Sequence, residues 1–264
     1  MTTLFLFAHQ DDEIGVFHEI TRTVRLGKPL RCIYLTNGAW DGVSPGRRNA
    51  ESITALATLG VRRQDIVFLG ERLGINDGQL PNHLEQAWDG LREIAETLAK
   101  GTAPVSRLIM QAWEGGHQDH DAVHLVGLAL ARHLDIVQQS FQFPLYRMPA
   151  GRFWLSFAAP LPQNGKVTQS PMGWRQRAAH LMMLRHYRSQ TKVMLRIGSH
   201  LLWHHLQGGG AKLQPVSLGR VLGRPNSGMM LYEYWQLSTE TEFRTQADPF
   251  IRQFITDVTR SKGT

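Results

Sequence analysis

Two short polar segments carry the residue types that bind metal ions and move protons. The first, FAHQDDE, spans residues 7–13 and follows directly on the apolar stretch Leu4 to Ala8. The second, WEGGHQDHDAVH, spans residues 113–124 and contains His117 and His120, three positions apart. A catalytic zinc ion typically takes three nitrogen or oxygen ligands from the protein and keeps one position open for water. Together the two segments hold enough ligands for one divalent metal site.

The first segment concentrates more negative charge than the start of a helix requires. Asp11, Asp12 and Glu13 are consecutive, so without a cation their charges would raise one another's pKa values and destabilise the fold. A helix N-terminus favours each anion by only about 0.3 to 1 kcal/mol. In the alternative interpretation, one aspartate is a helix N-cap, Glu13 is a first-turn acid and His9 is a polar residue at a strand end. The second segment favours the metal site over this alternative, because its His120 can supply a ligand in addition to those of the first segment.

These residue types suggest a division of roles. His9, one of the two aspartates and His120 would hold the metal, and the remaining aspartate would accept a proton from water whose pKa the cation lowers toward about 7. His117 would face the substrate, where an imidazolium can stabilise an oxyanion or protonate a leaving amine. Spacing does not decide whether Asp11 or Asp12 is the ligand.

The order of the predicted elements brings the two segments together. Up to residue 145 short apolar runs alternate with longer amphipathic ones, which predicts an α/β fold with a mostly parallel sheet and helices on both faces. We predict strands over residues 4–8, 30–36, 65–69, 108–111 and 141–145, and helices over residues 13–26, 47–59, 84–100 and 120–133. Ligands in such sheets bind beyond the carboxyl ends of the strands. Both segments follow a predicted strand, so their side chains are expected to meet at that edge.

The alternation stops after Pro144. We predict a single domain with a metal-binding core over residues 1–145 and an extension over residues 146–264 that shapes the substrate site. Within the extension we predict a strand over 152–158, one basic helix over 173–197, a flexible joint at 208–210 and a final strand over 229–236. The basic helix also carries apolar residues, which indicates packing with a solvated basic side.

Composition narrows the class of protein. The chain has 264 residues, of which 42% are hydrophobic and 19% charged, as in globular proteins that bury a large core. Its single cysteine, Cys32, can form neither an intramolecular disulfide nor a thiolate metal cage. The apolar stretch at the start lacks a preceding basic region and is interrupted by His9, so it predicts neither a signal peptide nor a membrane span. We therefore expect a cytoplasmic protein without a transmembrane segment.

The paired motifs AHQDDE and GGHQDH resemble the signatures of the LmbE-like, or PIG-L, family of zinc-dependent N-acetylglucosaminyl de-N-acetylases. The resemblance covers the whole predicted α/β half. It implies a Rossmann-like fold and a zinc ion held by His9, Asp12 and His120. It also implies that Asp11 is the general base and that His117 steadies the oxyanion or protonates the departing amine. The choice of Asp12 as the ligand comes from this resemblance. The same donors also accept Fe²⁺ or Co²⁺.

Two weaker matches nominate substrate-binding residues. RRNAE resembles the helix start from which such enzymes reach a sugar and nominates Arg48, while NDGQL resembles a loop that contacts sugar hydroxyls and nominates Asp77. The alternatives are a surface charge on a helix and a turn aspartate. Gln10 and Gln118 stand where proline is frequent in the family, and neither is a proposed ligand.

The sequence thus predicts a hydrolase that removes acetyl from an N-acetylated amino sugar, free or within a glycoconjugate. One alternative is another metallohydrolase on the same scaffold, acting on a phosphoester or a different amide with Mg²⁺ or Mn²⁺. A second is a non-enzymatic nucleic-acid binder, prompted by the net charge of +7 and the basic helix. No zinc finger, RNP-like or heptad pattern accompanies that helix, so we expect no nucleic-acid partner.

Overall fold

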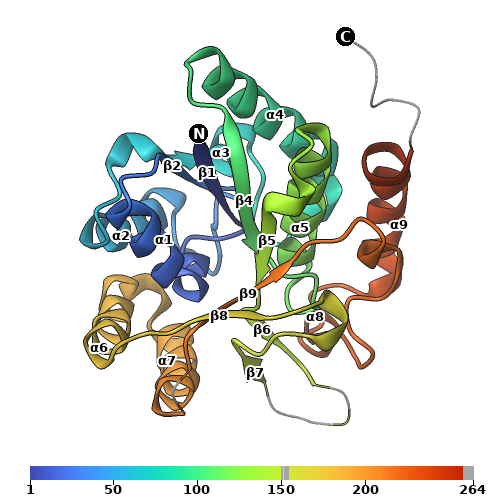
Figure 1. Ribbon diagram of the computed structural model, residues 1–264. Helices are drawn as coiled ribbons and strands as arrows, with labels where there is room; N and C mark the ends of the chain where they lie inside the picture. Colours follow the sequence, from blue (N-terminus) through green and yellow to red (C-terminus); the bar gives the residue numbers. More distant parts are fainter. Residues whose placement is uncertain (150, 152–154, 208, 258–264) are drawn as a thin grey trace.

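A seven-strand sheet forms the centre of the computed structural model, which describes residues 1–149, 151, 155–207 and 209–257 (Figure 1). The strand order is β3-β2-β1-β4-β5-β9-β8. Five strands pair in parallel: β1 (Thr2–Phe7), β2 (Leu30–Tyr34), β3 (Ile66–Phe68), β4 (Val105–Gln111) and β5 (Ser140–Phe143). Two strands continue the sheet in antiparallel pairing: β9 (Ala211–Pro215) and β8 (Thr168–Ser170). The predicted α/β fold is confirmed, and the sheet crosses the predicted boundary at residue 145.

Helices surround this sheet on both faces. The α-helices of the described residues are α1 (Phe17–Arg25), α2 (Pro45–Thr58), α3 (Leu69–Leu73), α4 (Leu84–Lys100), α5 (Gln118–His133), α6 (Trp174–Met183), α7 (Thr191–Leu206), α8 (Leu231–Tyr234) and α9 (Glu240–Phe250). Strands β6 (Tyr146–Arg147) and β7 (Ser156–Phe157) form a separate antiparallel pair. Among the described residues, no helix combines the length and the apolar character needed to cross a membrane.

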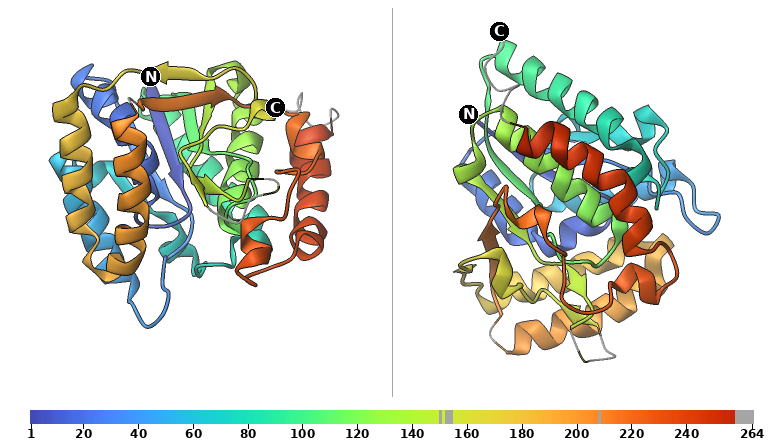
Figure 2. Two further views of the ribbon diagram at one scale, coloured as in Figure 1. Left: turned by 90° about the horizontal axis from the view of Figure 1, so that it is seen from below. Right: turned by 90° about the vertical axis from the view of Figure 1, so that its right-hand side faces the viewer.

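Strand β1 shows why both faces of the sheet are covered. Successive side chains of a strand point to opposite faces. Leu4 and Leu6 belong to a buried cluster with side chains of α4 and α5, whereas Phe5 and Phe7 belong to a second cluster with side chains of α1 and α2. Each such burial stabilises the fold by about 1.5 to 3 kcal/mol. Helix α9 packs against α4 and α5 on their outer side (Figure 2).

The C-terminal half differs from the sequence prediction in its helices. The single helix predicted over residues 173–197 is wrong, because α6 and α7 are separated by tight 3-10 turns at Leu184–His186 and Arg188–Gln190. Between these turns Tyr187 is buried, and its hydroxyl donates a hydrogen bond to Glu13 Oε1 at 2.8 Å. This long-range contact interrupts a sequence whose local pattern favours a continuous helix.

The predicted final strand is also wrong. Within residues 229–236 the chain forms the short helix α8, and the Glu233 side chain accepts a hydrogen bond from the Met230 amide at 3.1 Å, which caps the helix. Of the strand predicted over 152–158, residues 152–154 lie outside the described residues and Ser156–Phe157 form β7. Residue 208 of the predicted joint also lies outside them.

The strand order places the two polar segments side by side. Strands β1 and β4 are neighbours, although the chain between them first builds β2 and β3 on the other side of β1. The direction of strand addition therefore reverses at β1 and β4, and in open α/β sheets this reversal creates a crevice at the carboxyl ends. Figure 1 shows α6 and α7 at the same end of the sheet, away from the N-terminus.

Candidate active site

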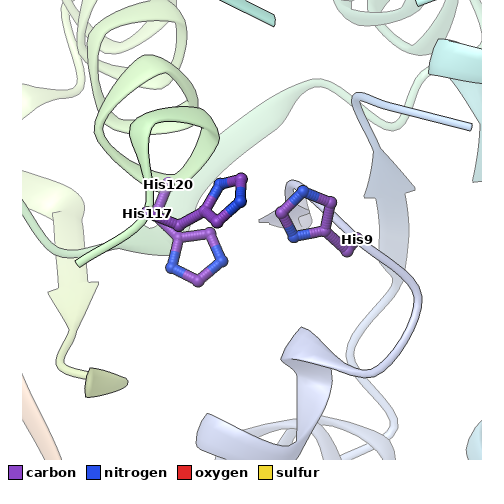
Figure 3. Close-up of side chains that lie close together, drawn as sticks. All are labelled: His9, His117 and His120. Carbon is purple, nitrogen blue, oxygen red and sulfur yellow. The ribbon is translucent and has the colours of Figure 1, made fainter. Parts of the chain in front are cut away.

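Three histidines meet at the carboxyl ends of β1 and β4. His9 lies in the loop after β1, His117 is the N-cap residue of α5, and His120 lies in the first turn of that helix. Ring nitrogens of the three side chains lie within 4.8 Å of one another. Figure 3 shows His9 facing the other two rings from the opposite side of a gap. The structure therefore brings together the two segments that are separated by about a hundred residues in the sequence.

Asp12 links the histidines of the two loops. Its Oδ2 accepts a hydrogen bond from the His9 amide at 2.6 Å and lies 3.4 Å from His9 Nδ1, while its Oδ1 lies 3.2 Å from His120 Nε2. Burial raises the pKa of Asp12, but His120 and His9 outweigh it and hold the pKa well below the usual value. The three predicted metal ligands thus converge, with Asp12 in its ionised form.

Two further carboxylates contact the outer nitrogen of His9. Asp119 Oδ2 lies 2.9 Å and Asp77 Oδ1 3.1 Å from His9 Nε2. The Asp119 carboxylate also accepts hydrogen bonds from the amides of Gly78, at 2.6 Å, and Leu80, at 3.0 Å, which fix its position. Burial lowers the pKa of His9, but Asp77, Asp12 and Asp119 together raise it well above the usual value. The electrostatic field at this point therefore favours a cation.

The residues present fit a divalent metal ion. Two imidazoles and a carboxylate converge from a buried frame, since Asp12 lies 3.4 Å from His9 Nδ1 and 3.2 Å from His120 Nε2. Nitrogen and carboxylate oxygen donors of this kind suit Zn²⁺ and other first-row transition metals. A bound cation would also compensate the negative charge that gathers around His9.

Asp11 is held apart from this set in an unusual backbone conformation. Its φ angle is 135°, and its amide donates a hydrogen bond to Glu13 Oε2 at 2.9 Å. The Asp11 carboxylate lies 3.3 Å from Arg48 Nη2 and lines the cavity described below. Burial raises the pKa of Asp11 to about 7, against the opposing effect of Arg48. A carboxyl group with this pKa can exchange a proton near neutral pH.

Glu13 connects the metal loop to the C-terminal half. The helix predicted from this residue begins only at Phe17, because Asp12–Gly15 form a 3-10 turn. Glu13 is fully buried there and accepts the hydrogen bond from the Tyr187 hydroxyl. Glu13 does lie in the first turn of this 3-10 segment, as in the alternative interpretation, but its contacts to Asp11 and Tyr187 also make it a structural link between two distant segments.

Arg48 and Asp77 also line the cavity, where the sequence analysis expects substrate contacts. Arg48 is buried, and its guanidinium donates hydrogen bonds to the carbonyl oxygens of Gln10, at 2.6 Å, and Gly38, at 2.9 Å. It also lies within ion-pair distance of Asp11 and, at 3.7 Å, of Asp77. These contacts indicate that Arg48 positions Asp11 and Asp77, and a substrate role for Arg48 or Asp77 stays a prediction.

His117 has a defined hydrogen-bonding role on one side of its ring. Its Nδ1 accepts a hydrogen bond from the Asp119 amide at 3.2 Å, so the neutral ring carries its proton on Nε2. Burial and the neighbouring His9 lower the pKa of His117 to about 4. The ring is therefore neutral at pH 7, and its Nε2–H is available as a donor on the side of the cavity.

A cavity of about 530 Å³ opens above these residues. The polar part of its lining, here called the floor, includes His9, His117, Asp11, Asp12 and Asp77, and its walls include Tyr146, Trp235 and residues of α7. The sequence analysis missed Asp119 and Tyr146, whose hydroxyl lies 3.5 Å from His120 Nε2. Asp119 lies inside the motif GGHQDH, and Tyr146 follows the end of β5, so position beyond a strand end was the available signal.

A comparison with protein-family models matches the N-terminal part of the chain. Residues 4–131 match the model of the PIG-L family, which is described as GlcNAc-PI de-N-acetylase. A search of curated protein sequences gives no match.

Solved structures of deacetylases share the fold at low sequence identity. A triple mutant of the teicoplanin-pathway deacetylase Orf2 superposes with a TM-score of 0.62 at 18% identity, covering 82% of this chain and 98% of its own. A structure described as the zinc inhibited form of Orf2 gives 0.61 at 16% identity with the same coverage. The N,N'-diacetylchitobiose deacetylase from Pyrococcus horikoshii gives 0.54 at 15% identity, covering 82% of each chain. The match to the PIG-L model over residues 4–131 covers all the histidines and carboxylates of the site.

Proposed function

We propose that this protein is a metal-dependent hydrolase that removes the acetyl group from an N-acetylated amino sugar. The observation that carries the proposal is the convergence of His9, Asp12 and His120 beneath a large cavity, with Asp11 held free of them. The family match over residues 4–131 supports the same class of reaction.

His9, Asp12 and His120 would hold the metal ion. A bound Zn²⁺, or Fe²⁺ or Co²⁺ in its place, supplies a Lewis acid that acidifies water and polarises the amide carbonyl. Asp77 and Asp119 contact His9 and would fix its orientation and increase its basicity.

Asp11 and His117 would handle protons and developing charge. The Asp11 carboxylate accepts a proton from the attacking water, and its pKa of about 7 suits a base that works near neutral pH. As the carbonyl carbon becomes tetrahedral, the Nε2–H of His117 donates a hydrogen bond to the oxygen that gains negative charge. The proton then passes from Asp11 to the sugar nitrogen, the carbon–nitrogen bond breaks, and acetate and a free amine leave.

The size and lining of the cavity support a conjugated GlcNAc-type substrate. Its volume of about 530 Å³ lies in the range of sites for drug-sized ligands, typically about 300 to 1,000 Å³. Apolar side chains of Leu145, Leu155 and Trp235 line it beyond the polar floor. We propose that the sugar occupies the floor and that an attached group contacts the apolar walls. The cytoplasm remains the proposed compartment, since Cys32, the single cysteine, is buried and unpaired.

Acetate release from a panel of N-acetylglucosamine conjugates tests this function directly. We expect release from at least one conjugate, loss of activity with a chelator, and recovery with about one equivalent of Zn²⁺, Fe²⁺ or Co²⁺. Because a related deacetylase is described in a zinc inhibited form, each metal is also added in excess. Phosphate release from phosphoesters with Mg²⁺ or Mn²⁺, with no acetate from any amide, would overturn the proposal.

A further inference from the structure

Helix α7 exposes apolar side chains on a face where surface helices normally carry polar ones. Leu195 is 73% exposed, Trp203 63% and Leu206 70%, and Leu202 is also exposed. The four positions follow the i, i+7, i+8, i+11 spacing of a single helix face. The opposite face packs into the protein through Met194, Leu201 and His205. The helix therefore has two apolar faces, and the described residues cover only one of them.

A basic stripe runs beside the exposed apolar face. Lys192, Arg196 and His200 are spaced four residues apart and share one side of α7. Across residues 174–206 the sequence has no Asp or Glu but six Lys and Arg, while the net charge of the whole chain is +7. Residues 174–206 thus account for six of the seven net positive charges of the chain.

The same stripe borders the mouth of the active-site cavity. Lys192, Arg196 and His200 line that cavity, as do Val193 and Ile197 on the next part of the helix surface. Around α7 the order is therefore buried face, exposed apolar face, basic stripe and cavity wall. Figure 2, in the view from below, shows α6 and α7 side by side at the left of the strands.

The combination of apolar and basic side chains identifies the partner. We propose that α7 docks the protein on an anionic lipid surface, with the cavity mouth beside that surface. An amphipathic helix with Lys or Arg flanking Leu and Trp lies in the membrane interface, where apolar side chains enter the acyl boundary and cations meet lipid phosphates. An isologous contact between two copies would place the basic stripes close together. A nucleic acid would neutralise the cations and leave the leucines and Trp203 in water.

Flotation with lipid vesicles tests the docking surface on the full chain without substrate. We expect binding to vesicles of phosphatidylcholine with phosphatidylglycerol, weaker binding to phosphatidylcholine alone, and a loss as salt rises. The double variant Trp203→Ser, Leu206→Ser should lower the partition coefficient by about tenfold or more. Leu222→Ser is the matched control, since Leu222 is 62% exposed in a turn outside α6 and α7.

Several outcomes would overturn the proposal. The first is that the wild-type protein does not bind anionic vesicles. The second is that the double variant and Leu222→Ser lose vesicle binding to the same extent. Dimerisation that the double variant abolishes, without vesicle binding, would assign the face to a second copy. Salt-sensitive DNA binding that the double variant retains, again without vesicle binding, would assign the charge to nucleic acid. Circular dichroism and thermal melting confirm that each variant is folded. Because no turnover is measured, these results do not depend on the proposed deacetylase activity.

Discussion

Histidines gather at two places in this protein, and the two groups differ in the charges around them. The active-site histidines, His9, His117 and His120, lie among Asp12, Asp77 and Asp119. The second histidine cluster consists of His18, His180, His204 and His205, which line a small cavity of about 30 Å³ between α1, α6, α7 and β9. In the described part of the chain, no Asp or Glu lines that second cavity.

The carboxylates reverse the effect of burial on one active-site imidazole, that of His9. In the active site they raise the pKa of His9 well above its usual value, although burial lowers it. In the second cluster burial dominates and lowers the pKa of His180 to about 3 and that of His205 to about 4. The neighbouring His204 and Arg177 lower the pKa of His205 further. Proximity of imidazoles alone therefore does not make a cation site, and surrounding carboxylates do.

The largest effect on metal content and turnover should come from removing a proposed ligand from the active site. The matched removal of a histidine from the second cluster should leave both unchanged. We expect His120→Ala to lose stoichiometric metal and to lower deacetylase turnover on the order of a thousandfold or more. His180→Ala, the matched change in the second cluster, should retain both. Elemental analysis of the two purified variants checks the comparison, and unchanged metal content in His120→Ala would remove that residue from the ligand set.

A change at Asp11 should separate metal binding from catalysis. Asp11→Asn keeps the size of the side chain and removes the proton acceptor, so we expect full metal content with turnover lower by about a hundredfold or more. Single-turnover acetate release, measured beside metal analysis, distinguishes the two effects. Normal turnover in the metal-loaded variant would exclude Asp11 as the base.

Asp119 should affect the metal affinity of the site through its contact with His9. It contacts His9 Nε2 at 2.9 Å and is itself fixed by two backbone amides. We expect Asp119→Asn to weaken metal affinity by about 10- to 100-fold, the usual effect of losing a carboxylate partner of a liganding histidine. Competition with a fluorescent chelator measures the affinity. An affinity equal to wild type would show that the carboxylate does not tune the site.

The smallest effect concerns the pH dependence of stability in the second cluster. Because the pKa of His180 is lowered to about 3, the unfolded state binds a proton near pH 6.5 that the folded state does not. Stability from this residue is therefore present above pH 6.5 and lost as pH falls. Lowering the pH from 7 to 5 should reduce the free energy of unfolding of both proteins. We expect this reduction to be about 1 to 2 kcal/mol smaller in His180→Leu than in wild type. Urea titrations at several pH values measure the free energy of unfolding of both proteins. The same pH dependence in the two proteins would contradict this prediction.

Sequence patterns predicted the parts of the site that lie next to strand ends. His9, Asp12 and His120 could be placed because parallel strands bring their carboxyl ends to one edge, whatever the length of chain between them. The role of Asp119 was not predictable in this way, since it depends on where the loop amides of Gly78 and Leu80 lie. The sequence around Asp119 does not show how close those amides lie to its carboxylate.

The C-terminal half was harder to predict for the same physical reason. Residues 173–197 have a local pattern that favours a continuous helix, yet the chain turns where Tyr187 reaches the buried Glu13. That contact joins positions 174 residues apart, so periodicity in a short window could not reveal it. The α7 residues that line the cavity were missed with it, because their position depends on this turn.

The backbone conformation at Asp11 has a cost that depends on the residue type at this position. A residue with a Cβ atom reaches a φ of 135° only at a cost of about 1 to 3 kcal/mol, whereas glycine adopts such angles readily. Replacement by glycine would thus relieve this backbone cost while deleting the carboxylate that lines the cavity. The backbone conformation at position 11 favours glycine, whereas the proposed chemistry needs the aspartate, so the two requirements oppose each other at this position.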